Sequence, residues 1–243
     1  MKKRNKIWIY PIIMGVFLMF SNSCKNASNN NDSHTNAGTV TDVDGNVYHT
    51  VTIGTQVWML ENLKTTKYND SNSIQLITDN AEWNKLSAPG YCWYNNDSAN
   101  KNIYGALYNW VTVNSGKLAP KGWHIPTDAE WTILTTFLSS TYFAGGKMKS
   151  TGNIEAGTGL WYTPNSGATN ESGFTAVPAG YRSSNGLFYV IGRSGFWWSS
   201  SERSDERSLI GYAWYRYLGF SNRYAYRGVF KKDAGFSVRC IRD

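Results

Sequence analysis

One segment, Gly122–Trp131, constrains the fold of this chain more than any other. In it, the side chain of Thr127 is placed to accept a hydrogen bond from the backbone N–H of Glu130, and the Glu130 carboxylate is placed to accept one from the N–H of Thr127. This reciprocal pair is a capping box, which starts a helix. Apolar residues then recur at helical spacing, namely Trp131, Leu134 and Leu138. We therefore predict a helix over 128–138 with one buried face.

The N-terminus has the three parts of an export signal. A basic start is followed by an apolar run over 7–20 that is too short and too interrupted for a good membrane span. Ser23 is the small residue that lipoprotein processing tolerates before a cysteine, so we predict a signal peptide over 1–23 and a lipid on Cys24. An ordinary cleaved signal with an incidental Cys24 is the alternative. The lipid would anchor the exported chain at the outer membrane or cell surface, with the periplasmic and the exposed face both open.

The net charge changes when the signal is removed. The formal charge of the whole chain is +7, and four of its cations lie in the signal, which leaves +3 on the mature chain. A nucleic-acid partner requires a basic stripe, and the mature sequence shows none. We therefore expect the membrane, through the lipid anchor, to be a partner and nucleic acid not to be one.

The mature chain divides into a tether and one domain. Residues 24–38 are rich in Asn and Ser and are predicted to be flexible, while 39–243 have the length and even composition of a single domain. Helices are expected to begin at Asp79, near Ile103 and at Asp128, with loops and short strands following position 138. The expected strands are 40–43, 47–53, 57–59, 174–177, 188–191, 196–199, 212–217 and 236–241. This order is typical of an α+β fold.

Five segments in a fixed order resemble a known family. They are GTQVWMLENL at 54–63, YGALYNW at 104–110, GWHIPTDAEW at 122–131, WWSSS at 197–201 and GFSVRCIRD at 235–243. Together they resemble the Fibrobacter succinogenes major paralogous domain, a family of exported bacterial proteins, over residues 40–243. The resemblance implies a distant kinship with C-type lectin-like proteins and formylglycine-generating enzymes. It therefore implies a C-type lectin-like core with short helices and a loop-rich antiparallel β region.

Two cysteines remain when Cys24 carries the lipid. Cys92 and Cys240 are expected to pair, because two cysteines in an oxidising compartment usually do. Such a disulfide would contribute about 4–5 kcal/mol in the chain-entropy model. Two buried free thiols are the alternative. Members of the resembled family often carry a cysteine just before the Pro-x-Gly-Trp segment, where this chain has Ala119, so the partner of Cys240 is expected to have moved to Cys92.

The sequence gives little sign of catalysis. Its histidines are His34, His49 and His124, and no two of them have metal-ligand spacing. It has no nucleophile elbow, phosphate loop or dinucleotide fingerprint. Formylglycine-generating enzymes hold copper with two closely spaced C-terminal cysteines, and here only Cys240 lies in that region. We therefore expect no catalytic residues and no enzyme activity, with a divergent enzyme of that type as the least favoured alternative.

A short polar loop is a weak candidate for calcium. Asn95, Asn96 and Asp97 offer the hard oxygen ligands that calcium takes. The same residue types are favoured in any turn, because their side chains bond to nearby backbone groups, and this interpretation is preferred. Apart from this weak calcium candidate, no cofactor is expected.

The strongest signal for binding is a run of aromatic residues interleaved with arginines near the C-terminus. Flat rings beside guanidinium donors suit sugars or peptides. The candidate ligand-binding residues are Trp214, Tyr215, Arg216, Tyr217, Arg223, Tyr224 and Arg227. Strand alternation sends only half of such a run inward, so core and surface roles stay balanced.

These observations favour a lipid-anchored envelope protein that binds glycan or protein without catalysis. A structural or accessory envelope protein with no small ligand is the second hypothesis. The sequence does not name the ligand or the oligomeric state.

Overall fold

A computed structural model describes residues 34–203 and 211–243. The predicted signal peptide over 1–23, Cys24 and the tether up to residue 33 lie outside the described residues. The first strand begins at His34, so ordered structure starts before the predicted domain boundary at residue 39. None of the helices within these described ranges is long and apolar enough to cross a membrane.

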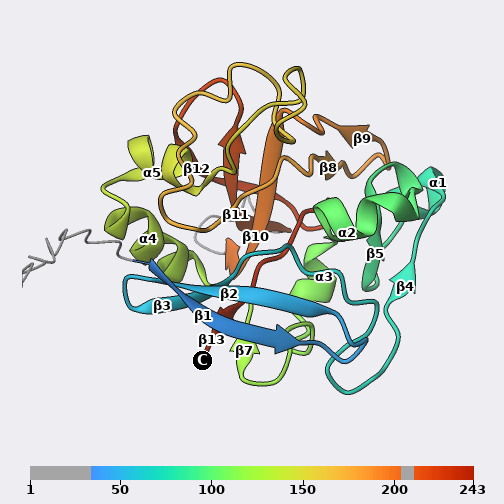
Figure 1. Cartoon of the computed structure of the whole chain (residues 1–243). Coiled ribbons are helices and arrows are strands. Elements are labelled where there is room, and N and C mark those ends of the chain that lie inside the picture. Colours follow the sequence, from blue (N-terminus) through green and yellow to red (C-terminus); the bar gives the residue numbers. More distant parts are fainter. Residues whose placement is uncertain (1–33, 204–210) are drawn as a thin grey trace, which may run out of the picture. The chain divides into compact units, whose positions relative to one another are not determined.

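The described chain is an α+β fold of short helices and mainly antiparallel sheets (Figure 1). The helices are α1 (Asn80–Asn84), α2 (Lys101–Tyr104), α3 (Trp110–Val113), α4 (Asp128–Phe137) and α5 (Thr141–Met148), with two 3₁₀ turns, η1 (Tyr94–Asn96) and η2 (Ser98–Asn100). The strands are β1 (His34–Thr41), β2 (Val47–Ile53), β3 (Gln56–Met59), β4 (Gln75–Leu76), β5 (Gly90–Cys92), β6 (Leu107–Tyr108), β7 (Trp123–His124), β8 (Tyr181–Arg182), β9 (Phe188–Tyr189), β10 (Ser194–Arg203), β11 (Tyr212–Gly219), β12 (Ala225–Lys231) and β13 (Ile241–Arg242). The predicted α+β class is therefore confirmed.

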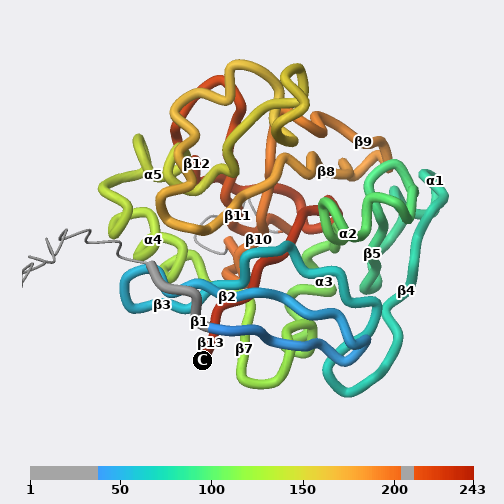
Figure 2. Tube along the Cα trace, viewed as in Figure 1, coloured from blue at the N-terminus to red at the C-terminus, as the bar shows by residue number. Residues whose placement is uncertain are grey.

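Two sheets carry most of the architecture. One has the strand order β1-β2-β3-β13-β7, so the last strand of the chain lies between the first hairpins and the segment that precedes α4. The tube in Figure 2 shows this return of the C-terminal segment alongside the early strands. The other sheet has the order β10-β11-β12, with β12 at its edge. Short ladders β4-β5-β6 and β8-β9 complete the strand pairing of the described residues.

Helix α4 forms as the sequence predicts. The Thr127 hydroxyl accepts from the Glu130 N–H at 3.2 Å, and the Glu130 carboxylate accepts from the Thr127 N–H at 2.7 Å. The apolar face packs into a core cluster that combines aliphatic side chains with several indole rings. Its tryptophans are Trp58, Trp131, Trp161 and Trp197, each fully buried. The capping box and the apolar stripe therefore locate the helix and orient it.

The predicted element near Ile103–Trp110 is wrong in detail. It is split into α2, β6 and α3. Gly105 ends α2 with a φ of 76°, and a Cβ at this position would lie 2.6 Å from the Cβ of Asn62. Asn109 then caps α3 by accepting from the Thr112 N–H. A contact distant in sequence therefore interrupts a stretch whose local pattern favours one helix.

Several expectations for the second half also differ from the structure. Helix α5 and strand β12 occupy segments where neither was predicted. The predicted strand over 174–177 is reduced to one isolated bridge, and the one over 236–241 to bridges that precede β13. The predictions near 188, 196 and 212 are confirmed as β9, β10 and β11.

Buried cations hold much of the loop-rich half. The ammonium group of Lys149 donates to three carbonyl oxygens, those of Ser166, Gly219 and Asn222, at 2.9–3.0 Å. Burial lowers the pKa of Lys149 to about 8. Arg239 and Arg182 are equally buried and also donate mainly to carbonyl oxygens. Loops that lack ladder partners therefore direct their carbonyl groups to these cations, which satisfies the buried acceptors.

Candidate ligand-binding site

The predicted aromatic and arginine run separates onto different surfaces. Strand β11 lies between β10 and β12, and its side chains alternate between the two faces of the sheet. Tyr215 and Tyr217 pack on one face against Phe196, with ring centroids 5.9 and 5.0 Å from it. Tyr215 also lies 5.2 Å from Phe236. These two predicted ligand-binding tyrosines are therefore partly buried and pack against the core.

The opposite face of β11 is tied to the start of α4 by a shared carboxylate. Arg216, whose side chain is 3% exposed, donates to Asp128 at 2.6 Å. Arg227 of β12 donates to both oxygens of the same carboxylate, at 2.8–3.0 Å. The Arg227 guanidinium also lies over the Trp214 ring, 3.4 Å from its centroid. Burial acts to raise the pKa of Asp128, but the bonds from the two arginines outweigh it and the pKa is lowered.

Beyond this network, three exposed tyrosine rings follow one another from α5 to β12, and the last of them, Tyr226, also lies 5.4 Å from Tyr217, its partner across the strands. Tyr142 lies 5.4 Å from Tyr224, and Tyr224 lies 5.3 Å from Tyr226, each pair nearly perpendicular at 89° and 80°. Their exposed fractions are 64%, 37% and 42%. The hollow that they form, which we call the tyrosine groove, has a volume of about 230 Å³. Its lining residues are Thr141, Tyr142, Tyr224, Ala225, Tyr226 and Arg227.

Two glycines bring α5 against β12 and so create the tyrosine groove. A Cβ on Gly145 would lie 2.2 Å from the carbonyl oxygen of Tyr224, and a Cβ on Gly146 would lie 2.4 Å from that of Gly167. The Gly146 N–H donates to the Arg223 carbonyl at 3.1 Å. Only residues without a side chain allow this approach. Two adjacent glycines would normally weaken a helix. Here Gly145 and Gly146 allow the close approach through which Tyr142 reaches Tyr224.

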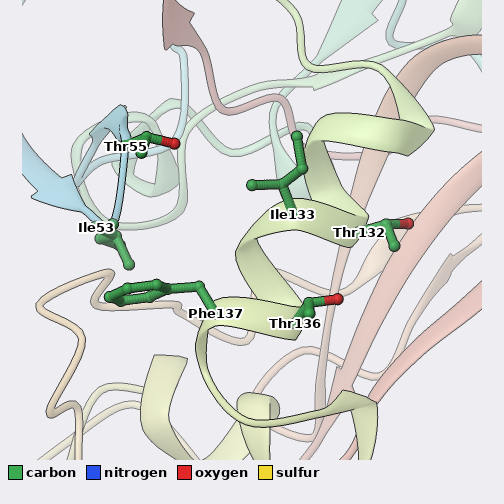
Figure 3. A pocket seen from close by; sticks show the side chains of 7 residues that line it. Ile53, Thr55, Thr132, Ile133, Thr136 and Phe137 are labelled. Carbon is green, nitrogen blue, oxygen red and sulfur yellow. The ribbon is translucent and has the colours of Figure 1, made fainter.

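A larger hollow lies between α4 and the turn that joins β2 to β3 (Figure 3). Phe137 projects from the helix toward Ile53, and Ile133 lies on the same helix one turn earlier. The volume is about 730 Å³, and its lining residues are Ile53, Gly54, Thr55, Thr132, Ile133, Thr136 and Phe137. None of these seven carries a charge. The polar side-chain groups of this hollow are threonine hydroxyls, whereas the tyrosine groove combines tyrosine hydroxyls with the guanidinium of Arg227, so we place the candidate site at the tyrosine groove.

The predicted calcium loop forms a turn. The Asp97 carboxylate accepts from the Ala99 N–H at 2.9 Å, which caps η2. Asn96 donates to the Thr78 carbonyl at 2.7 Å, and exposed Asn95 has a positive φ of 53°. In the described ranges, no three residues among His, Cys, Asp and Glu gather closely enough to hold a metal ion. These contacts are the ones that the turn interpretation requires.

The structure does not contain the expected disulfide. Cys92 and Cys240 are both free and fully buried. They belong to different core clusters, Cys92 beside Trp83 and Leu107, and Cys240 in the larger cluster around Phe236. Burial raises the pKa of Cys92 to about 12 and also raises that of Cys240. The prediction of pairing is therefore corrected to its alternative of two buried thiols, because each cysteine fills a separate part of the interior.

His124 of the predicted helix-start motif is clamped between two carboxylates. Its Nδ1 lies 2.7 Å from Asp243 and its Nε2 lies 2.8 Å from Glu130. Partial burial acts to lower the pKa of His124, but these hydrogen bonds outweigh it and the pKa is raised. The contact joins β7 to the first turn of α4 and to the C-terminal residue. His49 similarly meets exposed Glu61 at 2.7 Å on the outer sheet.

Sequence reasoning missed two residues of the tyrosine groove. Tyr142 was not selected, because its helix was not predicted. Tyr226 is absent from the candidate set, although it stands two positions after Tyr224. The signal available in the sequence was the exposed pair Tyr142–Phe143 directly before Ala-Gly-Gly. Of the predicted set, Tyr224 and Arg227 line the groove, and Arg223 adjoins it.

The described residues form an α+β domain with an exposed aromatic surface at a sheet edge. A family model, that of the Fibrobacter succinogenes major domain, matches residues 51–242, and the chain belongs to this family. The match spans the sheet that carries the site, α4, α5 and most of the five-stranded sheet. No curated protein and no solved structure matches the chain significantly.

Proposed function

We propose that this protein is a non-catalytic glycan-binding domain, and that the tyrosine groove is its binding site. The observation that carries the proposal is the convergence of Tyr142, Tyr224 and Tyr226, which keep 64%, 37% and 42% of their surface exposed. Rings of this kind, gathered from two elements, expose apolar surface that a ligand can cover. Tyr215 and Tyr217 of β11, by contrast, are partly buried and pack against the core.

The chemistry of the groove suits a sugar. A pyranose ring has apolar C–H faces and a rim of hydroxyl groups. Tyrosine supplies an apolar ring and a polar hydroxyl on one rigid side chain with few rotatable bonds. Successive rings here are nearly perpendicular. They therefore form a recess for a single chain or chain end, and not a flat platform for a crystalline surface.

Location and fold complete the proposal. We propose export through the signal over 1–23 and anchoring through a lipid on Cys24, which would hold the domain at the outer membrane or cell surface. We also propose that the core is C-type lectin-like, as the family resemblance implies. The pairing of the C-terminal strand β13 with β3 and the loop-rich segment before β10 support this assignment.

The absence of enzyme activity is also a proposal. Its support is the placement of the two remaining cysteines, Cys92 and Cys240, in separate clusters with raised thiol pKa values. A copper site of the formylglycine-generating type requires two neighbouring thiolates. Neither cysteine faces the tyrosine groove, whose lining contains no cysteine, histidine or carboxylate among the described residues.

A glycan array tests the proposal. The full chain, purified in mild detergent, would be applied with calcium and again with a chelator, alongside Tyr142→Ala and Tyr226→Ala. Tyr162→Ala is the matched control, because Tyr162 is 37% exposed and does not line the groove. We expect saturable binding that both groove variants lose and the control keeps. Loss of binding on chelation would support Asn95, Asn96 and Asp97 as calcium ligands. An array without any bound glycan, obtained with folded protein, would overturn the proposal.

A further inference from the structure

The tyrosine groove has a fixed cation at one end. Arg227 lines the groove, and its side chain is 45% exposed. Its Nε and Nη2 atoms donate to Asp128, and its guanidinium plane lies over Trp214. The side chain is therefore held from two directions before any ligand arrives, which lowers the entropy lost on binding.

The charge around Arg227 is unbalanced. Asp128 is one carboxylate shared by two guanidinium groups, Arg227 and the buried Arg216. Asp128 also stands in the first turn of α4, where the helix dipole adds positive potential. Among the described residues, none that lines the groove is acidic. The groove therefore presents net positive charge to a ligand.

A guanidinium has five N–H donors, and the described residues supply acceptors only to the Nε and Nη2 side of Arg227. The Nη1 side is left for a ligand. A carboxylate matches such a donor in geometry and charge, and bonds between two ionised groups are stronger than neutral ones. A neutral sugar hydroxyl could also accept from Nη1, but it would not balance the charge.

We propose that the groove selects acidic glycans, with the carboxylate of a uronic acid unit bound by Arg227 and the sugar ring held by the tyrosines. This inference rests on the proposed function and narrows it to one class of sugar. Recognition requires only the pre-oriented guanidinium and the ring faces, and no metal ion. The salt dependence of binding follows, because the contact is ionic and partly exposed.

The test compares each acidic sugar with its own neutral form. Oligosaccharides of galacturonate, glucuronate and mannuronate are titrated into the full chain beside their methyl esters, which keep the ring and remove the charge. We expect at least one acid to bind about tenfold more tightly than its ester, the effect of one charge-assisted contact. Arg227→Gln should remove this preference, so that the acid and its ester bind with equal affinity. Lys121→Gln removes an equal charge from an exposed position outside the groove and should have no effect.

Each other outcome overturns a defined part of the inference. Equal binding of acid and ester overturns the selectivity and leaves the proposed glycan-binding function in place. Tighter binding of sulfated glycans than of every uronate overturns the carboxylate assignment. An unchanged preference in Arg227→Gln overturns the role of that residue. Absence of saturable binding to every sugar, in protein shown to be folded by circular dichroism, overturns the inference and the proposed function together.

Discussion

Strands β11 and β12 carry the same kinds of side chain but use them differently. Tyr215 and Tyr217 of β11 are packed against Phe196 inside the sheet, whereas Tyr226 of β12 is 42% exposed at its edge. Arg216 and Arg227 are directly paired across the two strands and share Asp128, yet their side chains are 3% and 45% exposed. The position of a strand within its sheet therefore decides whether a tyrosine and an arginine stabilise the fold or remain available to a ligand.

The largest expected difference concerns the two tyrosines. Tyr215→Ala should lower the free energy of unfolding by about 2 kcal/mol, because it removes a partly buried ring that packs against Phe196 and Phe236. Tyr226→Ala should change it by less than about 0.5 kcal/mol, the usual range for an exposed position. Urea unfolding followed by tryptophan fluorescence measures both. Equal losses would show that the edge strand is as firmly packed as the central one.

The next difference concerns the two arginines. Arg216→Met should cost about 2 kcal/mol, because it breaks a buried pair and leaves Asp128 with only its exposed partner. Arg227→Met should cost about 0.5 kcal/mol, as for an exposed ion pair. The same unfolding experiment compares them. If the exposed arginine proved the more costly to remove, Arg227 would be a structural residue and not a ligand-binding one.

A glycine substitution probes the approach of α5 to β12. Gly145→Ala would place a Cβ 2.2 Å from the Tyr224 carbonyl oxygen, so the helix must move away. We expect a loss of about 2 kcal/mol, as for overpacking, together with weaker glycan binding because Tyr142 separates from Tyr224. Thr136→Ala, on the exposed side of α4, serves as the control for a substitution without a close contact. Unchanged glycan binding in folded Gly145→Ala would show that Tyr142 is not needed.

The smallest effects are expected in the pH dependence of stability, with opposite signs for two residues of the α4 region. The pKa of Asp128 is lowered in the folded state, so its contribution is present above about 3.8 and is lost as the pH falls through the folded-state pKa. The pKa of His124 is raised, so its contribution is present below about 6.5 and is lost as the pH rises through the folded-state pKa.

Thermal unfolding at a series of pH values measures both contributions. Asp128→Asn should flatten the acid limb of the profile, and His124→Gln should flatten the limb above neutrality. Asp128 pairs with the buried Arg216 and with the exposed Arg227. The acid limb of the stability profile should therefore become shallower in Arg216→Met than in Arg227→Met. A profile that all four variants leave unchanged would contradict the ion-pair account of this region.

Sequence reasoning succeeded where the determinant is local. The capping box Thr127–Glu130 and the Asp79 cap depend on neighbours within one turn, and both helices start where predicted. It failed where a distant contact decides the outcome. Gly105 breaks the expected helix because Asn62 lies against it, and Gly145 is tolerated within a helix whose close approach to the Tyr224 backbone leaves no room for a side chain. The same limit applies to the groove, since Tyr142 joins Tyr224 only through that approach.

The cysteines show a related limit. Composition and compartment favour pairing, but only the fold determines that Cys92 and Cys240 fill different clusters. For the Tyr/Arg run, strand alternation correctly indicates that half of the rings point inward. Which of these rings remain exposed depends on the strand order β10-β11-β12. The sequence pattern does not reveal this strand order.

The most direct test of the central claim is the dissociation constant of the full chain for its strongest glycan-array ligand, measured by calorimetry in wild type, Tyr226→Ala and Tyr162→Ala. The account predicts about tenfold weaker binding for Tyr226→Ala, as for the loss of one stacking ring, with wild-type stability. It predicts no change for Tyr162→Ala. Equal affinity in all three proteins would contradict the claim that the exposed edge of the Tyr/Arg run is the binding site.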